Sequence, residues 1–512
     1  IILSLEVVFW AVCFAETHIP AGDVFGVWEA SGSPYYIDGE IHVPTDSMLR
    51  IEQGCSIIFS DRYIFCVDSN ATLIAMGTEA DSIVFTSFWS PYHLRQGITF
   101  IHSSDSCILA YCIIENGVSG SYDEHDNCGG GIHCIQTNLT ICNCTIQENT
   151  AGIRGGGVYC YLSSPIIMDN MIVNNSVANR GAGISLESCH GLVENNYICG
   201  NSTLNYGGGI ECHYSDPEIY GNIISNNSGG GIYCYRSAPY IHENIISENV
   251  GPGIRLYSNS SGTISSNIIT YNESGYGGGI NIDFSRATVI NNVIAYNTGT
   301  YGGGLYCSWI HPCVYVYNNT ICNNSATLGG GLFSESGSVM VTRVNLFNNI
   351  FWNNYADSGS ELYLHFNYYP CEVFIAYTII NPYDCFLDDS CEIFWGEGNI
   401  NHNPIFADSI FHLSIGSPGI DDGADSVISP FGGIIYAPDV DYEGDSRPIE
   451  GGFDIGADES PYNWIHEKPL TIQSFSLTAF PNPFNSSCAI TAPAGAEVEI
   501  YDLRGNIVAT PF

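Results

Sequence analysis

A glycine cluster followed by an aliphatic residue recurs through the middle of the chain at a nearly constant interval. The first three copies are Gly129-Gly130-Gly131-Ile132, Gly155-Gly156-Gly157-Val158 and Gly181-Ala182-Gly183-Ile184. The aliphatic position continues at Ile210, Ile232, Ile254, Ile280, Leu305 and Leu332, so the successive spacings are 26, 26, 26, 22, 22, 26, 25 and 27 residues. A fixed period of this length indicates an architecture built from stacked repeats.

Two asparagine positions recur in phase with the glycines. One asparagine stands three residues after an Ile or Phe, at Asn149, Asn175, Asn201, Asn227, Asn249, Asn272, Asn297, Asn324 and Asn354. The other stands two residues before that Ile, at Asn170, Asn196, Asn222, Asn244, Asn267, Asn292 and Asn319. An asparagine that returns at one place in every repeat suggests side chains stacked in a ladder along a turn.

The repeats are rich in Gly, Asn, Ser, Tyr and Ile, which favour short strands and left-handed turns over helices. In period and composition the chain resembles the right-handed parallel β-helix, over roughly residues 20–385. The resemblance implies an all-β solenoid of about 22–27 residues per coil, with three strands per coil and rungs about 4.8 Å apart. Short strands of earlier, N-terminal coils are expected at residues 35–37, 41–43, 48–51, 56–59 and 82–85.

Alternation along the strand after each glycine cluster separates inward from outward positions. The residue two after the aliphatic is expected to point inward, at Cys134, Cys160, Leu186, Cys212, Cys234, Leu256, Ile282, Cys307 and Ser334. Because Cys alternates with Leu and Ile, we interpret these cysteines as buried thiols. Disulfides between adjacent rungs, such as Cys134–Cys160 or Cys212–Cys234, are the alternative.

Two columns on the same strand are expected to face outward. The first is His133, Tyr159, Ser185, Glu211, Tyr233, Arg255, Asn281, Tyr306 and Phe333; the second is Ile135, Tyr161, Glu187, His213, Tyr235, Tyr257, Asp283, Ser308 and Glu335. Tyrosine rings can stack on sugars, so Tyr159, Tyr161, Tyr233, Tyr235, Tyr257 and Tyr306 are candidate glycan contacts. The alternative is that tyrosine is merely a residue suited to strands.

The catalytic candidates in these columns are Glu187, Glu211 and His213. Glu187 and Glu211 fall on successive rungs in diagonal positions, roughly 8 Å apart, which suits the carboxylate pair of an inverting glycosidase. Such a pair can also arise by chance on an acidic surface. Polysaccharide lyases of this fold use Arg or Lys bases, whereas the repeats here contain no Lys.

The repeat is lost from about residue 386. Gly416-Ser417-Pro418-Gly419, Asp439-Val440-Asp441-Tyr442-Glu443-Gly444-Asp445-Ser446-Arg447-Pro448 and Asp454-Ile455-Gly456-Ala457-Asp458-Glu459 follow. This series resembles the choice-of-anchor Q domain found after bacterial β-helices. Its carboxylate density makes Asp439, Asp441 and Asp445 candidate calcium ligands, the alternative being acidic turns without an ion.

The ends of the chain suggest export. Residues 1–15 are predicted to be an incomplete signal peptide, with a buried first strand as the alternative. Residues 16–385 are assigned to the β-helix, 386–460 to the anchor-like acidic region, and 461–474 to a linker. Residues 475–512, with Pro481-Asn482-Pro483-Phe484-Asn485, resemble a truncated sorting domain of the type IX secretion system. The resemblance implies that this machinery is a partner of the intact parent protein and that the protein is secreted to the bacterial outer surface.

The net charge of the chain disfavours several classes of binding partner. The 53 acidic residues outnumber 12 basic ones, and the net charge of −41 disfavours nucleic acids, anionic membranes and unbridged polyanionic polysaccharides. No internal stretch is long and apolar enough for a membrane helix. The sequence therefore favours a secreted, non-catalytic β-helix that binds a polysaccharide or cell-surface glycan, as an adhesin or surface component. A carbohydrate-active enzyme, more readily a hydrolase than a lyase, is the alternative.

Overall fold

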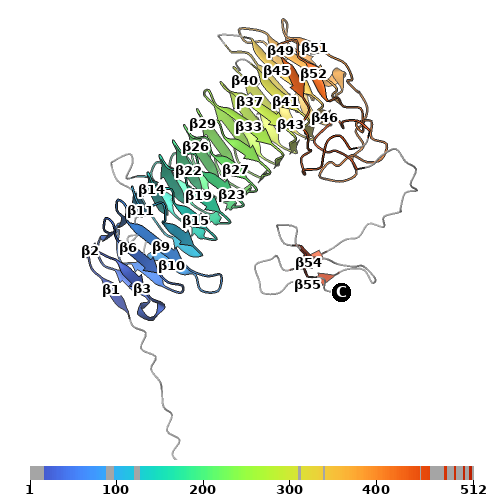
Figure 1. The fold of residues 1–512 in the computed structure, drawn as a ribbon. Helices are drawn as coiled ribbons and strands as arrows, with labels where there is room; N and C mark the ends of the chain where they lie inside the picture. Colours follow the sequence, from blue (N-terminus) through green and yellow to red (C-terminus); the bar gives the residue numbers. More distant parts are fainter. Residues whose placement is uncertain are drawn as a thin grey trace, which may run out of the picture. The chain divides into compact units, whose positions relative to one another are not determined.

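The computed structural model describes residues 16–87, 97–119, 127–309, 313–337, 341–449 and 451–461, and four short strands after residue 477. Two compact units are present, residues 1–463 and 464–512. The first unit is a parallel β-helix in which each coil contributes one strand to each of three long sheets (Figure 1). The predicted all-β solenoid is thus confirmed.

The three sheets contain 14, 15 and 15 strands. Sheet A consists of β1 (Thr17–Ile19), β4 (Tyr35–Ile37), β7 (Ser56–Phe59), β10 (Ile83–Ser87), β13 (Cys112–Glu115), β16 (Thr145–Gln147), β20 (Met171–Val173), β24 (Tyr197–Cys199), β28 (Ile223–Ser225), β31 (Ile245–Ser247), β34 (Ile268–Thr270), β38 (Val293–Ala295), β42 (Thr320–Cys322) and β46 (Ile350–Trp352). Sheet B consists of β2 (Gly22–Asp23), β5 (Ile41–Val43), β8 (Phe65–Val67), β11 (Ile98–Ile101), β14 (Ile132–Ile135), β18 (Val158–Tyr161), β22 (Ile184–Glu187), β26 (Ile210–His213), β29 (Ile232–Tyr235), β32 (Ile254–Tyr257), β36 (Ile280–Asp283), β40 (Leu305–Ser308), β44 (Leu332–Glu335), β48 (Leu362–His365) and β50 (Cys385–Leu387). Sheet C consists of β3 (Gly26–Trp28), β6 (Met48–Ile51), β9 (Thr72–Met76), β12 (Ile108–Ala110), β15 (Thr140–Cys142), β19 (Ile166–Met168), β23 (Leu192–Glu194), β27 (Glu218–Tyr220), β30 (Tyr240–His242), β33 (Ser261–Ser265), β37 (Arg286–Ile290), β41 (Val314–Tyr317), β45 (Thr342–Phe347), β49 (Cys371–Ala376) and β51 (Glu392–Trp395).

Short strands also pair between sheets A and B. They are β17 (Thr150–Ala151), β21 (Ser176–Val177) and β25 (Ser202–Thr203), and then β35 (Glu273–Tyr276), β39 (Thr298–Tyr301), β43 (Ser325–Leu328) and β47 (Tyr355–Ser358). Two 3₁₀ turns, η1 (Ala30–Gly32) and η2 (Pro382–Asp384), complete the described part of the coils. Parallel pairing runs on through β50 and β51, so the solenoid ends near Trp395, beyond the boundary at residue 385 that the loss of the glycine repeat suggested.

Both asparagine positions form ladders inside the turns. In one, Asn175 Oδ1 accepts hydrogen bonds from the backbone N–H of Asn149 at 3.1 Å and from its side-chain amide at 3.0 Å, and the same amide donates to the Ile114 carbonyl at 2.9 Å. The pattern repeats coil by coil to Asn354. A second ladder runs from Asn170 to Asn349. The ladders satisfy the backbone groups that each buried turn leaves unpaired.

The glycines of the repeat make room for this stacking. A Cβ atom added to Gly157 would lie 2.7 Å from the Gly183 carbonyl oxygen and 3.1 Å from the Asn175 amide nitrogen. The strand that follows then packs its predicted inward positions into the core, where Cys134, Cys160 and Leu186 have no exposed surface. The cysteines of this column are free thiols in this structure.

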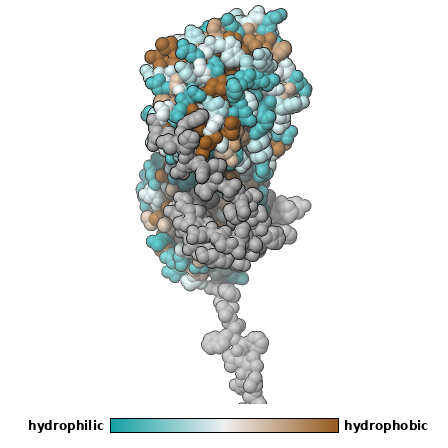
Figure 2. Space-filling view, turned by 90° about the vertical axis from the view of Figure 1, so that its right-hand side faces the viewer, coloured by the Kyte–Doolittle hydropathy of each residue, from teal (hydrophilic) through white to brown (hydrophobic). Residues whose placement is uncertain are grey.

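Residues 401–461 leave the coil path and pack on the outer face of sheet A. Phe411, Tyr442 and Ile455 join a buried apolar cluster with Val293 of β38 and Ile350 of β46. This region contains one described hairpin, β52 (Ser426–Ile428) with β53 (Ile434–Tyr436). On the face shown in Figure 2, hydrophilic side chains predominate and hydrophobic ones form separate small groups.

The second unit contains two described antiparallel pairs: β54 (Thr478–Phe480) with β55 (Ala489–Thr491), and β56 (Ile500–Tyr501) with β57 (Ile507–Ala509). The predicted signal peptide, most of the linker and the motif at residues 481–485 lie outside the described residues.

Replacing an asparagine of the ladder should lower the free energy of unfolding more than replacing an exposed asparagine. Replacing Asn227 with Ala leaves the Asn201 N–H and amide without their buried acceptor, so the free energy of unfolding should fall by about 1–3 kcal/mol per group left unpaired. Asn205→Ala, an exposed substitution of the same type, should leave it within about 0.5 kcal/mol. Urea denaturation followed by circular dichroism measures both, and equal losses in the two variants would contradict the ladder's role.

Candidate functional site

The outer face of sheet B is only partly open. A strip of residues joined by parallel bridges, Cys128, Arg154, Arg180 and Tyr206, runs alongside this face. Further along, the short strands β35, β39 and β43 place Tyr276, Tyr301 and Leu328 near the same face. The strip is built by the residues just before the glycine clusters, a position for which we made no prediction from the sequence.

The strip corrects the prediction that the first column faces solvent. Tyr159 is 1% exposed, Tyr233 2%, Glu211 0% and Tyr306 5%. Arg180 lies 5.4 Å from the centre of the Tyr233 ring, so this ring packs under the strip and cannot stack on a polysaccharide in this structure. In the second column Ser308 is buried, at 1% exposed, but the other members, including Tyr161, Tyr235 and Tyr257, are half-buried and reach solvent.

The three catalytic candidates do gather around one strip residue, Arg154. The Arg154 guanidinium donates to Glu187, which also accepts a hydrogen bond from Tyr159 Oη at 2.8 Å and lies 3.3 Å from His213 Nδ1. Arg154 Nε lies 3.8 Å from Glu211 Oε2. Strand register pairs Glu187 with His213 and Ser185 with Glu211. Glu187 and Glu211 therefore lie diagonally on neighbouring strands, as predicted from the sequence. Sequence reasoning missed Arg154 itself.

The two carboxyl groups of this cluster differ in their ionisation. Burial acts to raise the pKa of Glu187, but hydrogen bonds from His213 and Arg154 outweigh it and lower the pKa to about 2. Burial raises the pKa of Glu211, which Arg154 offsets only in part. Glu211 has no exposed surface and its described hydrogen-bond donor is Ser185, at 2.8 Å. The cluster is therefore a largely buried charge network, in which Glu211 is inaccessible and the side chains of His213 and Glu187 are 13% and 19% exposed.

A pocket of about 670 Å³ opens farther along sheet B. Its base includes Asp283, Ser308 and Glu335 of the second column. We call it the Asp283 pocket, and its remaining lining is Thr203, Leu204, Asn205, Tyr206, Ser228, Gly229, Val250, Gly251, Pro252, Arg255, Glu273, Ser274, Gly275, Tyr276, Asn281, Phe284, Tyr306 and Trp309. Its volume lies within the range of small-ligand sites.

Three carboxylates line this pocket, those of Glu273, Asp283 and Glu335, and the last two have different partners. Arg255 Nη2 lies 3.5 Å from Asp283 Oδ2, and the guanidinium lies 4.4 Å from the centre of the Tyr206 ring and 4.9 Å from that of Tyr257. Tyr306 Oη and Ser308 Oγ donate to Glu335. Burial raises the pKa of Asp283 to about 6, although Arg255 acts to lower it.

The register fixes the spacing of the pair. Asp283 is paired with Ser308 and Ser308 with Glu335, so the two carboxylates stand two rungs apart, with about 9.6 Å between their Cα atoms. Both belong to the column that the sequence analysis expected to face outward. The sequence contains no pattern that predicts the pocket around them. The pocket is formed by the strip and by the turn residues Phe284 and Trp309.

The predicted calcium ligands are partly brought together. Asp441 and Asp445 lie with Glu443 in a group whose oxygens are within 4.8 Å of one another, whereas Asp439 is not part of that group. Asp441 Oδ1 accepts the backbone N–H groups of Glu443 and Asp445, each at 2.9 Å, and Oδ2 accepts that of Glu459 at 3.0 Å. Asp441 thus already organises a turn.

Comparison with known families fits this architecture. The family model described as "Right handed beta helix region" matches residues 76–237, 169–309 and 243–369, which together span more than half of the chain. The chain belongs to this right-handed β-helix family. No curated protein matches the chain.

Two similar solved structures are a mutant of the periplasmic alginate epimerase AlgG and the pectate lyase Pel9A. The first is 12% identical, with a TM-score of 0.35, and the match covers 72% of this chain and 76% of that one. The second is 11% identical, with a TM-score of 0.30, and the match covers 80% and 88%. Among the described residues, no helix has the length and apolar character needed to cross a membrane.

The charge network around Arg154 predicts a stability effect. Arg154→Met leaves Glu187 and Glu211 without their shared cation, so the free energy of unfolding should fall by about 3–5 kcal/mol at pH 7. Arg286→Met, at an exposed position of β37, should change it by less than about 0.5 kcal/mol. Thermal and urea denaturation compare the two. A neutral Arg154→Met variant would mean that the network is not needed for stability.

Proposed function

We propose that this chain is a secreted, surface-attached β-helix protein that binds a neutral polysaccharide in the Asp283 pocket. The observation that carries the proposal is the combination of aromatic side chains, carboxylates and one arginine around a single opening of sheet B. Tyr276 is 50% exposed and Phe284 40% exposed at this opening. Aromatic faces stack on the apolar faces of sugars, and the carboxylates accept hydrogen bonds from their hydroxyl groups.

Charge supports a neutral ligand. The net charge of −41 repels a polyanionic chain before it reaches the pocket. Within the pocket Arg255 is engaged with Asp283 and two tyrosine rings, so it is not free to pair with successive uronate groups.

The attachment part of the proposal rests on sequence motifs. Residues 386–460 resemble a choice-of-anchor Q domain, and residues 475–512 resemble a type IX sorting domain. We infer that the parent protein is carried across the outer membrane by that machinery and that the β-helix is displayed on the bacterial surface as an adhesin or surface component.

Binding in the pocket predicts a specific loss of affinity. In a panel of neutral and acidic polysaccharides tested by calorimetry, a neutral polymer should bind. Trp309→Ala and Tyr276→Ala should each weaken its binding by at least about tenfold through lost ring stacking. Tyr240→Ala removes a ring of similar exposure from β30 of sheet C, 44% against 50% for Tyr276, and should leave binding unchanged. Selective binding of acidic polymers, or equal losses in all three variants, would contradict the pocket assignment.

A second candidate function, glycoside hydrolysis with inversion, is favoured by the Asp283–Glu335 pair. Glu335 accepts hydrogen bonds from Tyr306 and Ser308, which fix the orientation of its carboxylate and suit a base that activates water. Asp283, with its pKa of about 6, retains a proton in mildly acidic solution and suits the general acid. Their Cα atoms stand about 9.6 Å apart in one column, and an inverting pair needs about 6.5–9.5 Å between its two carboxyl groups to admit a water molecule.

Hydrolysis by this pair predicts a pH profile. Release of reducing ends should fall above about pH 6, because Asp283 then loses the proton that it must donate. Asp283→Asn and Glu335→Gln should each lower kcat by at least about 100-fold. Glu187→Gln serves as the comparison: if this variant alone loses activity, the Arg154 cluster is the active site. No release from any polymer leaves binding as the function.

A further inference from the structure

His412 lies at the centre of a second polar cluster, on the region that packs against sheet A. Its Nδ1 atom is 2.6 Å from Asp408 Oδ2. Its Nε2 atom is 2.9 Å from Glu443 Oε2 and 2.9 Å from Tyr442 Oη. One nitrogen, Nε2, and the oxygens of two residues thus meet on one side of the ring.

Asp458 completes this cluster from within the fold. The residue is only 4% exposed, and its Oδ2 accepts the Leu413 N–H at 2.7 Å. No described residue donates to its other oxygen. One ligand atom from each of His412, Glu443 and Asp458 lies within 4.8 Å of the other two. The second oxygen of this largely buried carboxylate is therefore available to a cation.

The possible ligand atoms converge on one nitrogen of His412. Nδ1 lies against Asp408, so Nε2 is the nitrogen that faces Glu443 and Asp458, with the Tyr442 hydroxyl 2.9 Å away. An imidazole nitrogen flanked by two carboxylates is a ligand set for a metal ion, and an ion there would offset the repulsion between the two carboxylates.

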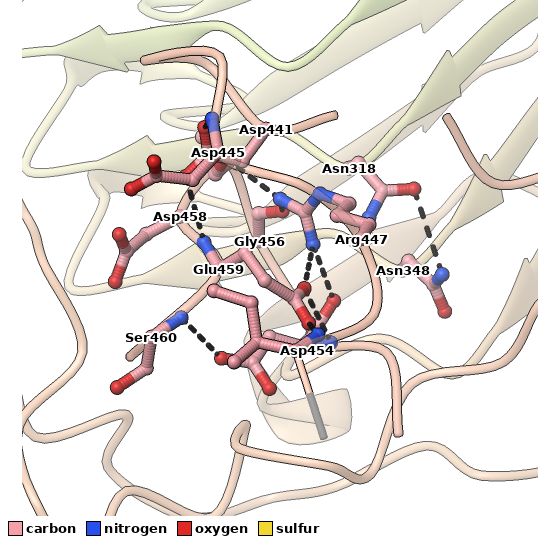
Figure 3. Close-up of polar contacts among 12 residues, drawn as sticks. Asn318, Asn348, Asp441, Asp445, Arg447, Asp454, Gly456, Asp458, Glu459 and Ser460 are labelled. Atoms are coloured by element: carbon pink, nitrogen blue, oxygen red, sulfur yellow. Dashed lines mark hydrogen bonds and ion pairs between the residues drawn. The ribbon is translucent and has the colours of Figure 1, made fainter. Parts of the chain in front are cut away.

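Arg447, a buried arginine of the same region, donates its hydrogen bonds to other groups. Arg447 has no exposed side-chain surface; it donates to Glu459 Oε2 at 2.8 Å and to the carbonyls of Asp454, Gly456 and Ala457 at 3.1, 2.8 and 2.7 Å (Figure 3). It therefore neutralises Glu459 and orders the loop that presents Asp458, but it donates to none of the groups around His412.

We propose that His412, Glu443 and Asp458 bind a divalent transition-metal ion of the zinc type, with Asp408 as the positioning residue. One imidazole nitrogen with two carboxylate oxygens suits zinc-like ions, whereas calcium and magnesium prefer all-oxygen sites. The Asp408–His412 contact is the second-sphere carboxylate that orients a metal-binding histidine. The Tyr442 hydroxyl or a water molecule is available for the fourth position.

The site would act as a cross-link. Its ligands come from three segments, at residues 408–412, 442–443 and 458, which neighbour the apolar contacts that hold this region on sheet A through Phe411, Tyr442 and Ala457. An ion here would tie those segments to one another and strengthen the attachment of the acidic region to the last coils.

The test is metal binding by the full chain after removal of metals with EDTA. One equivalent of Zn²⁺ should bind in calorimetry and raise Tm, while Ca²⁺ at the same concentration should not displace it. Co²⁺ should give visible d–d bands without thiolate charge-transfer bands, which excludes the cysteine-containing group His42, Cys66 and Asp68 as the source.

Matched variants locate the ion. His412→Gln and Asp458→Asn should weaken Zn²⁺ binding by at least about 100-fold, and Asp408→Asn by about 10–100-fold. Glu443→Gln, at an exposed position, supplies a variant in which folding is not at risk. Asp445→Asn should bind Zn²⁺ normally. Loss of binding in Asp445→Asn but not in His412→Gln would move the ion to the Asp441–Glu443–Asp445 group. Zn²⁺ binding that is unchanged in Glu443→Gln, or no stoichiometric binding, would overturn the proposal.

Discussion

The structure depends on the pairing of each coil with the next. Strand hydrogen bonds join the flat parts of successive coils, and the asparagine ladders join the turns, where a backbone carbonyl would otherwise be buried unpaired. Each side-chain amide bridges the coils on either side of it. Stability is then close to a sum of contacts between neighbouring coils, and the identity of the outward residues is left free to vary. Function can therefore be placed anywhere along the outer faces without a cost to the core.

On sheet B the outward residues vary in this way. The turn residues before the glycine clusters fold over the first outward column and turn it into a covered layer of rings and charges, with Arg154, Arg180 and Arg255 packed among tyrosines and carboxylates. Where the strip gives way to the wider turns at Phe284 and Trp309, the layer opens into the Asp283 pocket. The same residue types thus form a buried network at one end and an accessible site at the other.

The fold could be predicted because its signals are local and repeated. Glycine spacing gave the coil length, the asparagine columns predicted the ladders, and two-residue alternation placed Cys134 and its counterparts in the core. The site was only half predictable. Strand register correctly brings Glu187, Glu211 and His213 together, but burial of Tyr159 and Tyr233 depends on turn residues whose path over the sheet has no periodic signature. Asp283 and Glu335 were placed in the right column, yet nothing local distinguishes them from the other acidic residues. His412 meets Glu443 and Asp458 only through the packing of three separate segments.

The central claim is that the Asp283 pocket is where this β-helix meets its ligand. A crystal structure of the full chain with an oligosaccharide of the polymer that it binds tests this claim directly. We expect electron density for sugar rings between Tyr276 and the packed pair of Phe284 and Trp309, with hydroxyl groups within hydrogen-bond distance of Asp283 or Glu335. Density on another face of the solenoid, with the pocket holding only water, would contradict it.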